Sequence, residues 1–183
     1  MGQLAERQRP LRRVEYERLA EEGFFEDERI ELINGVILEM SPQNVPHSNP
    51  IQLLTRLLVP PLVGRADVRV QLPFAADDFS LPEPDFAVVS PTLSQVEHPS
   101  QAFLVIEVAN SSLQFDRSTK ADLYARVGVP EYWVVNVVDR VVERHLEPRG
   151  RAYARVDTLR PGDTIALSAF PDVSVDVAAL FPV

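Results

Sequence analysis

Cysteine is absent from this 183-residue chain. Its absence excludes disulfide bonds, thiol nucleophiles and cysteine-ligated metals. No stretch reaches the roughly 18 consecutive apolar residues that a membrane helix needs. The charged start, MGQLAERQRPLRRVEYERL, also lacks the apolar core of a signal peptide. We therefore expect a cytoplasmic protein with no membrane partner.

Lysine is almost absent as well, because Lys120 is the only one in a chain that has 18 basic residues, the others being arginine. The compact, strongly hydrated ammonium of lysine and the planar guanidinium of arginine are not interchangeable. A chain that uses arginine everywhere else has kept one ammonium. Lys120 becomes informative if it falls in a functional site.

Positive charge is scarce in the middle of the chain, and the formal net charge is −9. Residues 21–138 hold seven basic and seventeen acidic residues, whereas residues 1–20 and 139–160 are each net +2. The overall charge argues against a surface that binds nucleic acid everywhere. An acidic middle between basic flanks fits a metal site with phosphate contacts at its rim, and it fits an ordinary solvated surface equally well.

Apolar periodicity predicts the secondary structure. Helices are expected at residues 12–23, 47–59 and about 117–127, the second ending at Pro60-Pro61. Strands are expected at residues 29–33, 36–41, 67–74, 85–89, 103–108, 131–138, 140–147 and 151–158. The first two strands flank Asn34-Gly35, a strong hairpin signal, and the last two form a second hairpin.

This order of elements predicts an α/β (α+β) fold with a mixed central β-sheet flanked by helices and additional β-hairpins. With 183 residues, of which 45% are hydrophobic, the chain can bury one good core. We see no internal repeat and no linker. Residues 1–183 are therefore expected to form a single domain.

Three charged residues stand on otherwise apolar elements. Glu107 interrupts the apolar strand Phe103–Val108, where a carboxylate is costly unless it is paired or binds a metal. Asp85 opens the apolar run that follows Pro84. Lys120 shares a helix face with Leu123 and Tyr124, at spacings that place all three toward the sheet.

Two carboxylates on neighbouring strands can hold Mg²⁺ or Mn²⁺. Such an ion polarises a phosphoryl oxygen and generates a nucleophile from water, and a nearby ammonium stabilises the charge that develops on phosphate. Spacing alone also allows a second interpretation, in which Glu107 and Lys120 form a buried ion pair and Asp85 caps a turn.

The segments IELINGVILEMSP, PEPDFAVV and LVIEVANSSLQFDRSTKADLYARVGVPEYWVVN resemble a large family described as putative restriction endonucleases, once catalogued as a domain of unknown function, in the PD-(D/E)XK nuclease superfamily. The similarity runs from about Tyr16 to beyond Asn136. The motifs Pro-Asp, Ile-Glu-Val, Asp-x-x-x-Lys-x-x-x-Tyr and Glu-Tyr-Trp are specific only in combination.

The resemblance implies a restriction-endonuclease-like core and a Mg²⁺-dependent endonuclease, with Mn²⁺ as an alternative ion and nucleic acid, expected to be DNA, as the substrate. It implies Asp85 and Glu107 as metal ligands and catalytic residues. The standard motif places lysine two residues after the second acid, where this chain has Ala109, so Lys120 would supply the ammonium from the next helix. Glu31 matches a recurring acid and joins the catalytic set. Cutting both strands of a duplex would favour a homodimer.

Several residues keep two interpretations. Glu31 could instead be a surface cross-strand partner, and His47 could contact phosphate or form a hydrogen bond at a helix start. Asp116 is most simply a helix cap. Tyr124 could hold a phosphate or orient Lys120, or it could be a half-buried core residue. Glu83 is an outside candidate. The function also has an alternative: a non-catalytic nucleic-acid or protein interaction module that retains the nuclease fold, as the acidic balance and Ala109 would allow.

Overall fold

A computed structural model describes residues 9–40, 45–91 and 97–181. Its centre is a six-stranded sheet with the strand order β3-β4-β5-β6-β7-β8. The strands are β3 (Asp67–Val70), β4 (Phe86–Val89), β5 (Leu104–Ala109), β6 (Glu131–Asn136), β7 (Val141–Arg149) and β8 (Ala152–Leu159). Only β5 and β6 pair in parallel. The predicted mixed sheet is confirmed.

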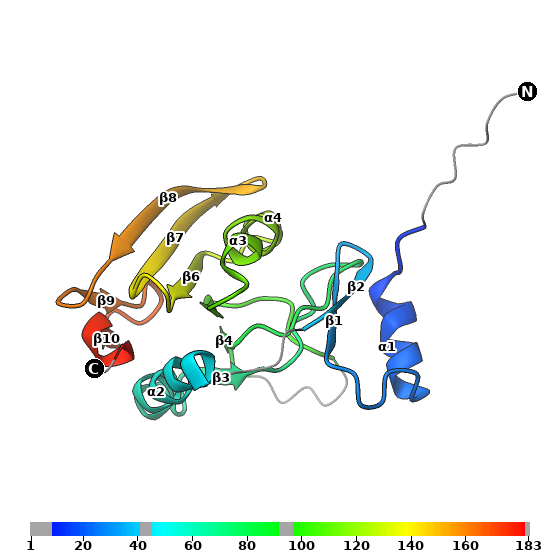
Figure 1. Ribbon diagram of the computed structural model, residues 1–183, viewed down its shortest axis with the longest axis horizontal. Coiled ribbons are helices and arrows are strands. Elements are labelled where there is room, and N and C mark those ends of the chain that lie inside the picture. The colour runs from blue at the N-terminus through cyan, green and yellow to red at the C-terminus, as the bar shows by residue number, and fades with distance from the viewer. Residues whose placement is uncertain (1–8, 41–44, 92–96, 182–183) are drawn as a thin grey trace, which may run out of the picture.

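Helices cover both faces of this sheet (Figure 1). They are α1 (Arg13–Glu21), α2 (Val45–Leu62), α3 (Leu113–Phe115), the π-helix η1 (Asp116–Lys120), α4 (Ala121–Arg126) and the 3-10 helix η2 (Val177–Leu180). Two small sheets complete the fold: β1 (Ile30–Ile33) with β2 (Val36–Glu39), and β9 (Thr164–Ala166) with β10 (Ser174–Asp176). No helix in the described ranges is both long and apolar enough to cross a membrane.

Alternate residues of β5 enter two different hydrophobic clusters. Leu104, Ile106 and Val108 pack with α2 and the C-terminal segment on one face. Val105 and Ala109 face α4 on the other. Because successive strand residues point to opposite faces, Glu107 lies on the α4 face. The strand is buried on both sides, and its one carboxylate therefore has to find its partners inside the protein.

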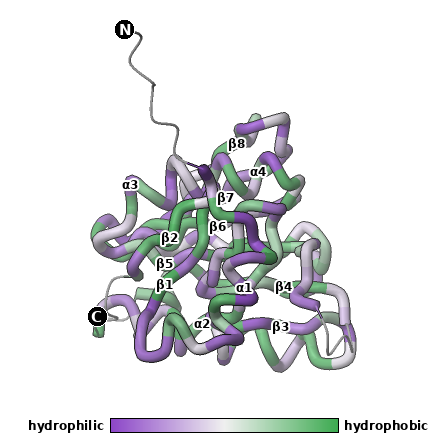
Figure 2. Tube along the Cα trace, turned by 90° about the vertical axis from the view of Figure 1, so that its right-hand side faces the viewer, coloured by the Kyte–Doolittle hydropathy of each residue, from purple (hydrophilic) through white to green (hydrophobic). Residues whose placement is uncertain are grey.

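The predicted hairpin at Asn34-Gly35 is confirmed by the pairing of β1 with β2. Both turn residues have positive φ, 51° and 78°, as a type I′ turn requires. A Cβ at Gly35 would lie 2.9 Å from the Cα of Pro10, so the turn has no room for a side chain. The hairpin lies beside α1, whose residues are mainly hydrophilic (Figure 2) and which buries only Tyr16.

Two predicted element ends differ from the structure by three or four residues. Helix α2 continues through Pro60-Pro61 to Leu62, because Leu58 and Leu62 are fully buried against the sheet and this packing keeps the last turn helical despite the missing N–H groups. The strand expected at residues 67–74 ends at Val70. The next residue, Gln71, has a φ of 51° and turns the chain out of the strand.

Candidate active site

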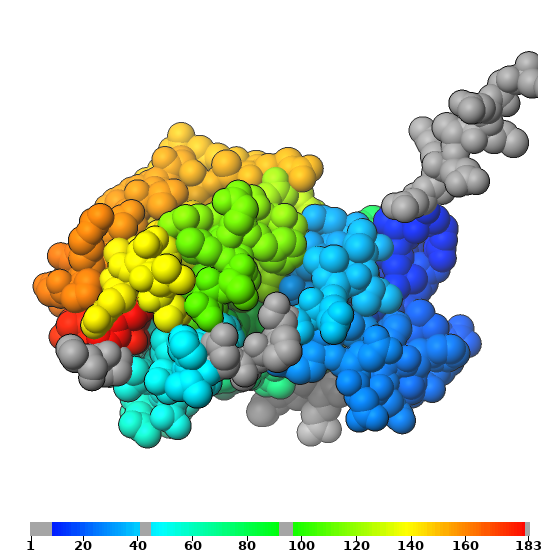
Figure 3. All heavy atoms as spheres, in the orientation of Figure 1, coloured from blue at the N-terminus to red at the C-terminus, as the bar shows by residue number. Residues whose placement is uncertain are grey.

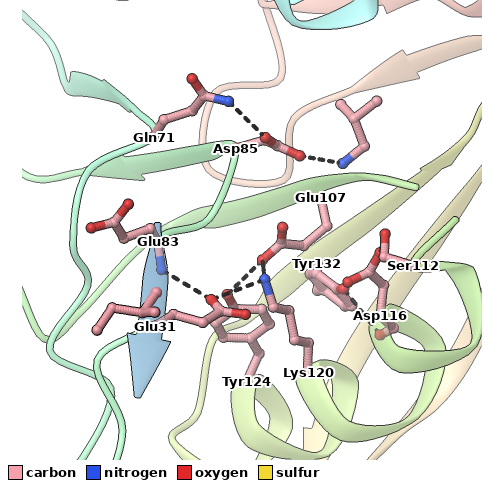
Figure 4. A network of polar contacts seen from close by, with 12 residues as sticks. Glu31, Gln71, Glu83, Asp85, Glu107, Ser112, Asp116, Lys120, Tyr124 and Tyr132 are labelled. Carbon is pink, nitrogen blue, oxygen red and sulfur yellow. Dashed lines mark hydrogen bonds and ion pairs between the residues drawn. The ribbon is translucent and has the colours of Figure 1, made fainter. Parts of the chain in front are cut away.

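Lys120 joins two acids inside the protein. Its Nζ donates a hydrogen bond of 3.0 Å to Glu107 Oε1 and lies 3.3 Å from Glu31 Oε2 (Figure 4). Each of the three residues is only 5% exposed. Three of the residues that the sequence singled out thus meet from β1, β5 and η1. The burial of Glu31 excludes the interpretation that it is a surface cross-strand partner.

Asp85 lies immediately before β4, on the same side of the sheet. The register pairs Phe86 with Ile106, and one further step places Asp85 opposite Glu107. Its Oδ2 accepts a 2.7 Å hydrogen bond from the backbone N–H of Val108, and its Oδ1 accepts one of 3.2 Å from Gln71 Nε2. The bond to Val108 crosses to a neighbouring strand, so the carboxylate does not cap a turn. It is held beside Glu107.

A π-helix carries Lys120. The sequence predicted one regular helix over about residues 117–127, whereas the structure has α3, then five π-helical residues, then α4. Asp116 and Lys120, at the two ends of the π segment, are its buried residues. Single π-helical turns are rare and are frequent at functional sites. Here the wider turn directs two charged side chains toward the sheet.

Two residues of this helix have other roles than the sequence indicated. Tyr124, expected to be half-buried core, is fully buried, and its hydroxyl donates a 2.8 Å hydrogen bond to Glu107 Oε1. Asp116 makes no helix cap. Its Oδ2 accepts a 2.6 Å hydrogen bond from Ser112 inside the protein.

Gln71 was missed entirely, because no sequence pattern marks a glutamine that bonds to Asp85. Its backbone N–H also donates to the carbonyl oxygen of Asp85, at 3.2 Å. His47, at the start of α2, has its Nε2 3.3 Å from Asp85 Oδ2. Glu83 donates its backbone N–H to Glu31 Oε2 at 3.3 Å. These residues surround the predicted set.

The electrostatics of the cluster are dominated by burial and by excess negative charge. Burial raises the pKa of Glu107 well above its usual value, although Lys120 opposes this. The pKa of Asp116 is raised for the same reason. Burial alone would lower the pKa of Lys120, but the carboxylates of Glu107 and Glu31 outweigh it and the pKa is raised. Lys120 is therefore charged, and one ammonium faces several acids.

A cavity of about 400 Å³ opens onto this cluster. His47, Gln71 and Phe115 line its wall. The wall also includes the charged residues of the cluster: Glu31, Glu83, Asp85, Glu107, Asp116 and Lys120. In the space-filling view the α3–α4 segment (green) and the β1–β2 hairpin (blue) lie side by side on the surface (Figure 3). Both contribute residues to the cavity, which can admit part of a substrate to the charged groups.

The residues present fit a hard divalent cation. Carboxylate oxygens are the donors that Mg²⁺ and Mn²⁺ prefer, and Mg²⁺ is commonly bound by one or two carboxylates while keeping several waters. Within the described residues no three His, Asp or Glu side chains form a ready-made metal cluster. Lys120 stands between Glu31 and Glu107. The pair that could hold the ion is therefore Asp85 and Glu107.

Comparison with known proteins identifies the family of the chain. The sequence profile of the Uma2 family, described as "Putative restriction endonuclease", matches residues 13–178. The chain belongs to this family. The resemblance predicted from the Pro-Asp, Ile-Glu-Val and Lys-x-x-x-Tyr motifs is confirmed, and the family supports a nuclease function for this Uma2 protein.

A solved structure supports the fold of the Uma2 chain. The crystal structure of "a putative nuclease belonging to DUF820 from Anabaena variabilis ATCC 29413" superimposes with a TM-score of 0.62. The two sequences are 17% identical, and the alignment covers 83% of this chain and 89% of the other. This likeness confirms the restriction-endonuclease-like architecture. No curated protein sequence matches the chain.

Proposed function

We propose that this Uma2 protein is a divalent-metal-dependent endonuclease that hydrolyses phosphodiester bonds in nucleic acid, with DNA as its substrate. The observation that carries the proposal is the meeting of Asp85, Glu107 and Lys120 at one cavity. These residues come from β5, from η1 and from the residue that precedes β4, in a nuclease-like fold. Local spacing alone does not bring such residues together.

The metal ligands would be Glu107, on β5, and Asp85, immediately before β4. A bound Mg²⁺ or Mn²⁺ would polarise a phosphoryl oxygen and lower the pKa of water. The hydrogen bond from the backbone N–H of Val108 ties Asp85 to β5, which suits a site that has to keep its geometry. A cation also relieves the repulsion among four carboxyl groups that share one ammonium: Glu31, Asp85, Glu107 and Asp116.

Lys120 would act on the substrate. Its ammonium is buried and charged, and it can donate a hydrogen bond to the phosphate as negative charge builds up in the transition state. Glu31 Oε2, 3.3 Å from Nζ, holds the ammonium together with Glu107. Asp85 and Glu107 would thus bind the metal, and Lys120 would stabilise the charge on the phosphate.

The test is a cleavage assay on single-stranded DNA, double-stranded DNA and RNA, with Mg²⁺ or Mn²⁺. Asp85→Asn, Glu107→Gln and Lys120→Met should each reduce the rate by about 100-fold or more, the usual cost of losing a group that stabilises the transition state. Asp172→Asn, which removes an exposed acid paired with Arg65, is the matched control. Cleavage that survives all three site substitutions would refute the assignment.

A non-catalytic interaction module is the second candidate, and one observation favours it. Lys120 already pairs with Glu107 and Glu31, so the charges are partly satisfied without a metal. Calorimetric titration with Mn²⁺ separates the two. Binding that disappears in Glu107→Gln supports the nuclease, whereas the absence of binding at millimolar Mn²⁺ supports the module.

A further inference from the structure

Tyr124 reaches the site from α4, which packs on the same face of the sheet as Glu107. Its side chain is fully buried, and its ring packs against Tyr132 with centroids 5.0 Å apart and against Phe74 at 6.4 Å. Packing on two sides leaves the ring little freedom to reorient. The hydroxyl therefore projects toward β5 from a fixed position, and there it meets Glu107.

The hydroxyl of Tyr124 and the ammonium of Lys120 donate to the same oxygen, Oε1 of Glu107. The second carboxylate oxygen points away from both donors, toward the side of the cluster where Asp85 lies (Figure 4). Turning the carboxylate plane away from this position would leave a buried hydroxyl without an acceptor, which is unfavourable. The phenol therefore fixes the orientation of the carboxylate plane, with one oxygen of Glu107 held by the two donors and the other directed toward Asp85.

Lys120 alone would fix this orientation less well. Its ammonium rotates freely about a flexible stem and is shared with Glu31. Tyrosine offers one hydroxyl on a rigid ring whose only described acceptor is Glu107.

We propose that Tyr124 is a positioning residue that orients Glu107 for binding a divalent cation. The inference rests on the proposed function, because it takes Glu107 as a metal ligand. Groups that hydrogen-bond to metal ligands set ligand orientation, and losing one typically costs 10- to 100-fold in metal affinity or activity. Tyr124 is therefore expected to act on metal affinity without touching the substrate.

The experiment is calorimetric titration of the full-length protein with Mn²⁺ in the absence of nucleic acid. Tyr124→Phe keeps the packed ring and removes only the hydroxyl, and it should weaken Mn²⁺ binding by about 10- to 100-fold. Tyr153→Phe is the matched control, since that hydroxyl bonds to the carbonyl of Val129, outside the site. The control should bind Mn²⁺ like the wild type.

Glu107→Gln separates the two hypotheses. If the wild type binds Mn²⁺ and Glu107→Gln does not, the metal site stands. Equal affinity of Tyr124→Phe and Tyr153→Phe would then overturn the role of Tyr124 alone. If Glu107→Gln binds like the wild type, the metal assignment itself fails.

A kinetic readout distinguishes positioning from direct catalysis and from a structural effect. With saturating Mn²⁺, Tyr124→Phe should recover a cleavage rate close to that of the wild type, because every charged group remains. A rate that stays low at saturating metal would overturn the proposal. In thermal unfolding without metal, Tyr124→Phe and Tyr153→Phe should lower the Tm by similar amounts. If Tyr124→Phe is unfolded under conditions in which Tyr153→Phe is folded, its loss of Mn²⁺ affinity would count against the inference.

Discussion

Among single residues, Lys120 is confined by its burial. It is 5% exposed and lies between two buried acids. A guanidinium is larger, planar and needs more donors satisfied, so Lys120→Arg keeps the charge but does not fit. We expect about a 100-fold or larger loss of cleavage, with a destabilisation of about 1–3 kcal/mol from overpacking. Arg160→Lys, the reverse exchange away from the cavity, should be neutral in both urea unfolding and cleavage assays.

Asp116 gives a prediction about pH. Its pKa is raised in the folded protein, mainly by burial. The folded state therefore binds its proton more tightly than the unfolded state does, so its contribution to stability is present at low pH and is lost as pH rises through the folded-state pKa. Asp116→Asn should gain stability relative to the wild type as the pH rises above 3.8, the ordinary pKa of aspartate. Urea unfolding at several pH values measures this, and a difference independent of pH would contradict it.

Arg29 lines the cavity and, among the described residues, makes no side-chain hydrogen bond or ion pair. An exposed guanidinium that lines the cavity suits a phosphate of the substrate backbone. Arg29→Gln should weaken DNA binding and reduce the slope of log affinity against log salt by about one. Arg160→Gln should leave the slope unchanged. An unaltered slope in Arg29→Gln would place the phosphate contacts elsewhere.

At the scale of elements, strands and hairpins were predictable because their signals are local. The apolar run around Glu107 identified β5, and Asn34-Gly35 identified the hairpin. The end of α2 was not predictable, because the burial of Leu62 outweighs the two prolines. The π-helix was not predictable either, since its extra residue per turn leaves no pattern in the sequence.

The β1–β2 turn gives an element-scale prediction. Gly35→Ala adds a Cβ that meets Pro10 and also forces an unfavourable positive φ, so we expect a loss of about 1–3 kcal/mol in the free energy of unfolding. Gly64→Ala is the matched control, because Gly64 has a φ of 75° but no neighbouring atom within 4 Å. Equal losses in the two variants would show that the contact with Pro10 contributes nothing.

Some residues of the candidate site were predictable from the sequence, and others were not. Asp85, Glu107 and Lys120 were recognisable because charged residues on apolar elements are conspicuous, and the structure brings Glu31 to them. Their catalytic roles stay predictions until the variants are assayed. Gln71 could not be found from sequence, because its importance comes from a loop that returns to Asp85 from the preceding strand.

For the whole molecule, metal binding should appear as added stability. A cation that binds only the folded state stabilises it by about 2.7 kcal/mol at 100 times its dissociation constant. Mn²⁺ should therefore raise the Tm of the wild type, and removal of the ion with EDTA should reverse the change. In Asp85→Asn the rise should disappear. A rise of equal size in that variant would indicate binding at another place on this acidic surface.

The distance along the chain between Glu107 and its ammonium has a consequence for finding related enzymes. Lys120 sits on the crossover between β5 and β6, while Ala109, two residues after the acid, is fully buried in the core. Searches that require a fixed interval between acid and lysine would overlook this chain. A search over folded coordinates, asking only that an ammonium lie within bonding distance of a strand carboxylate, would retrieve it.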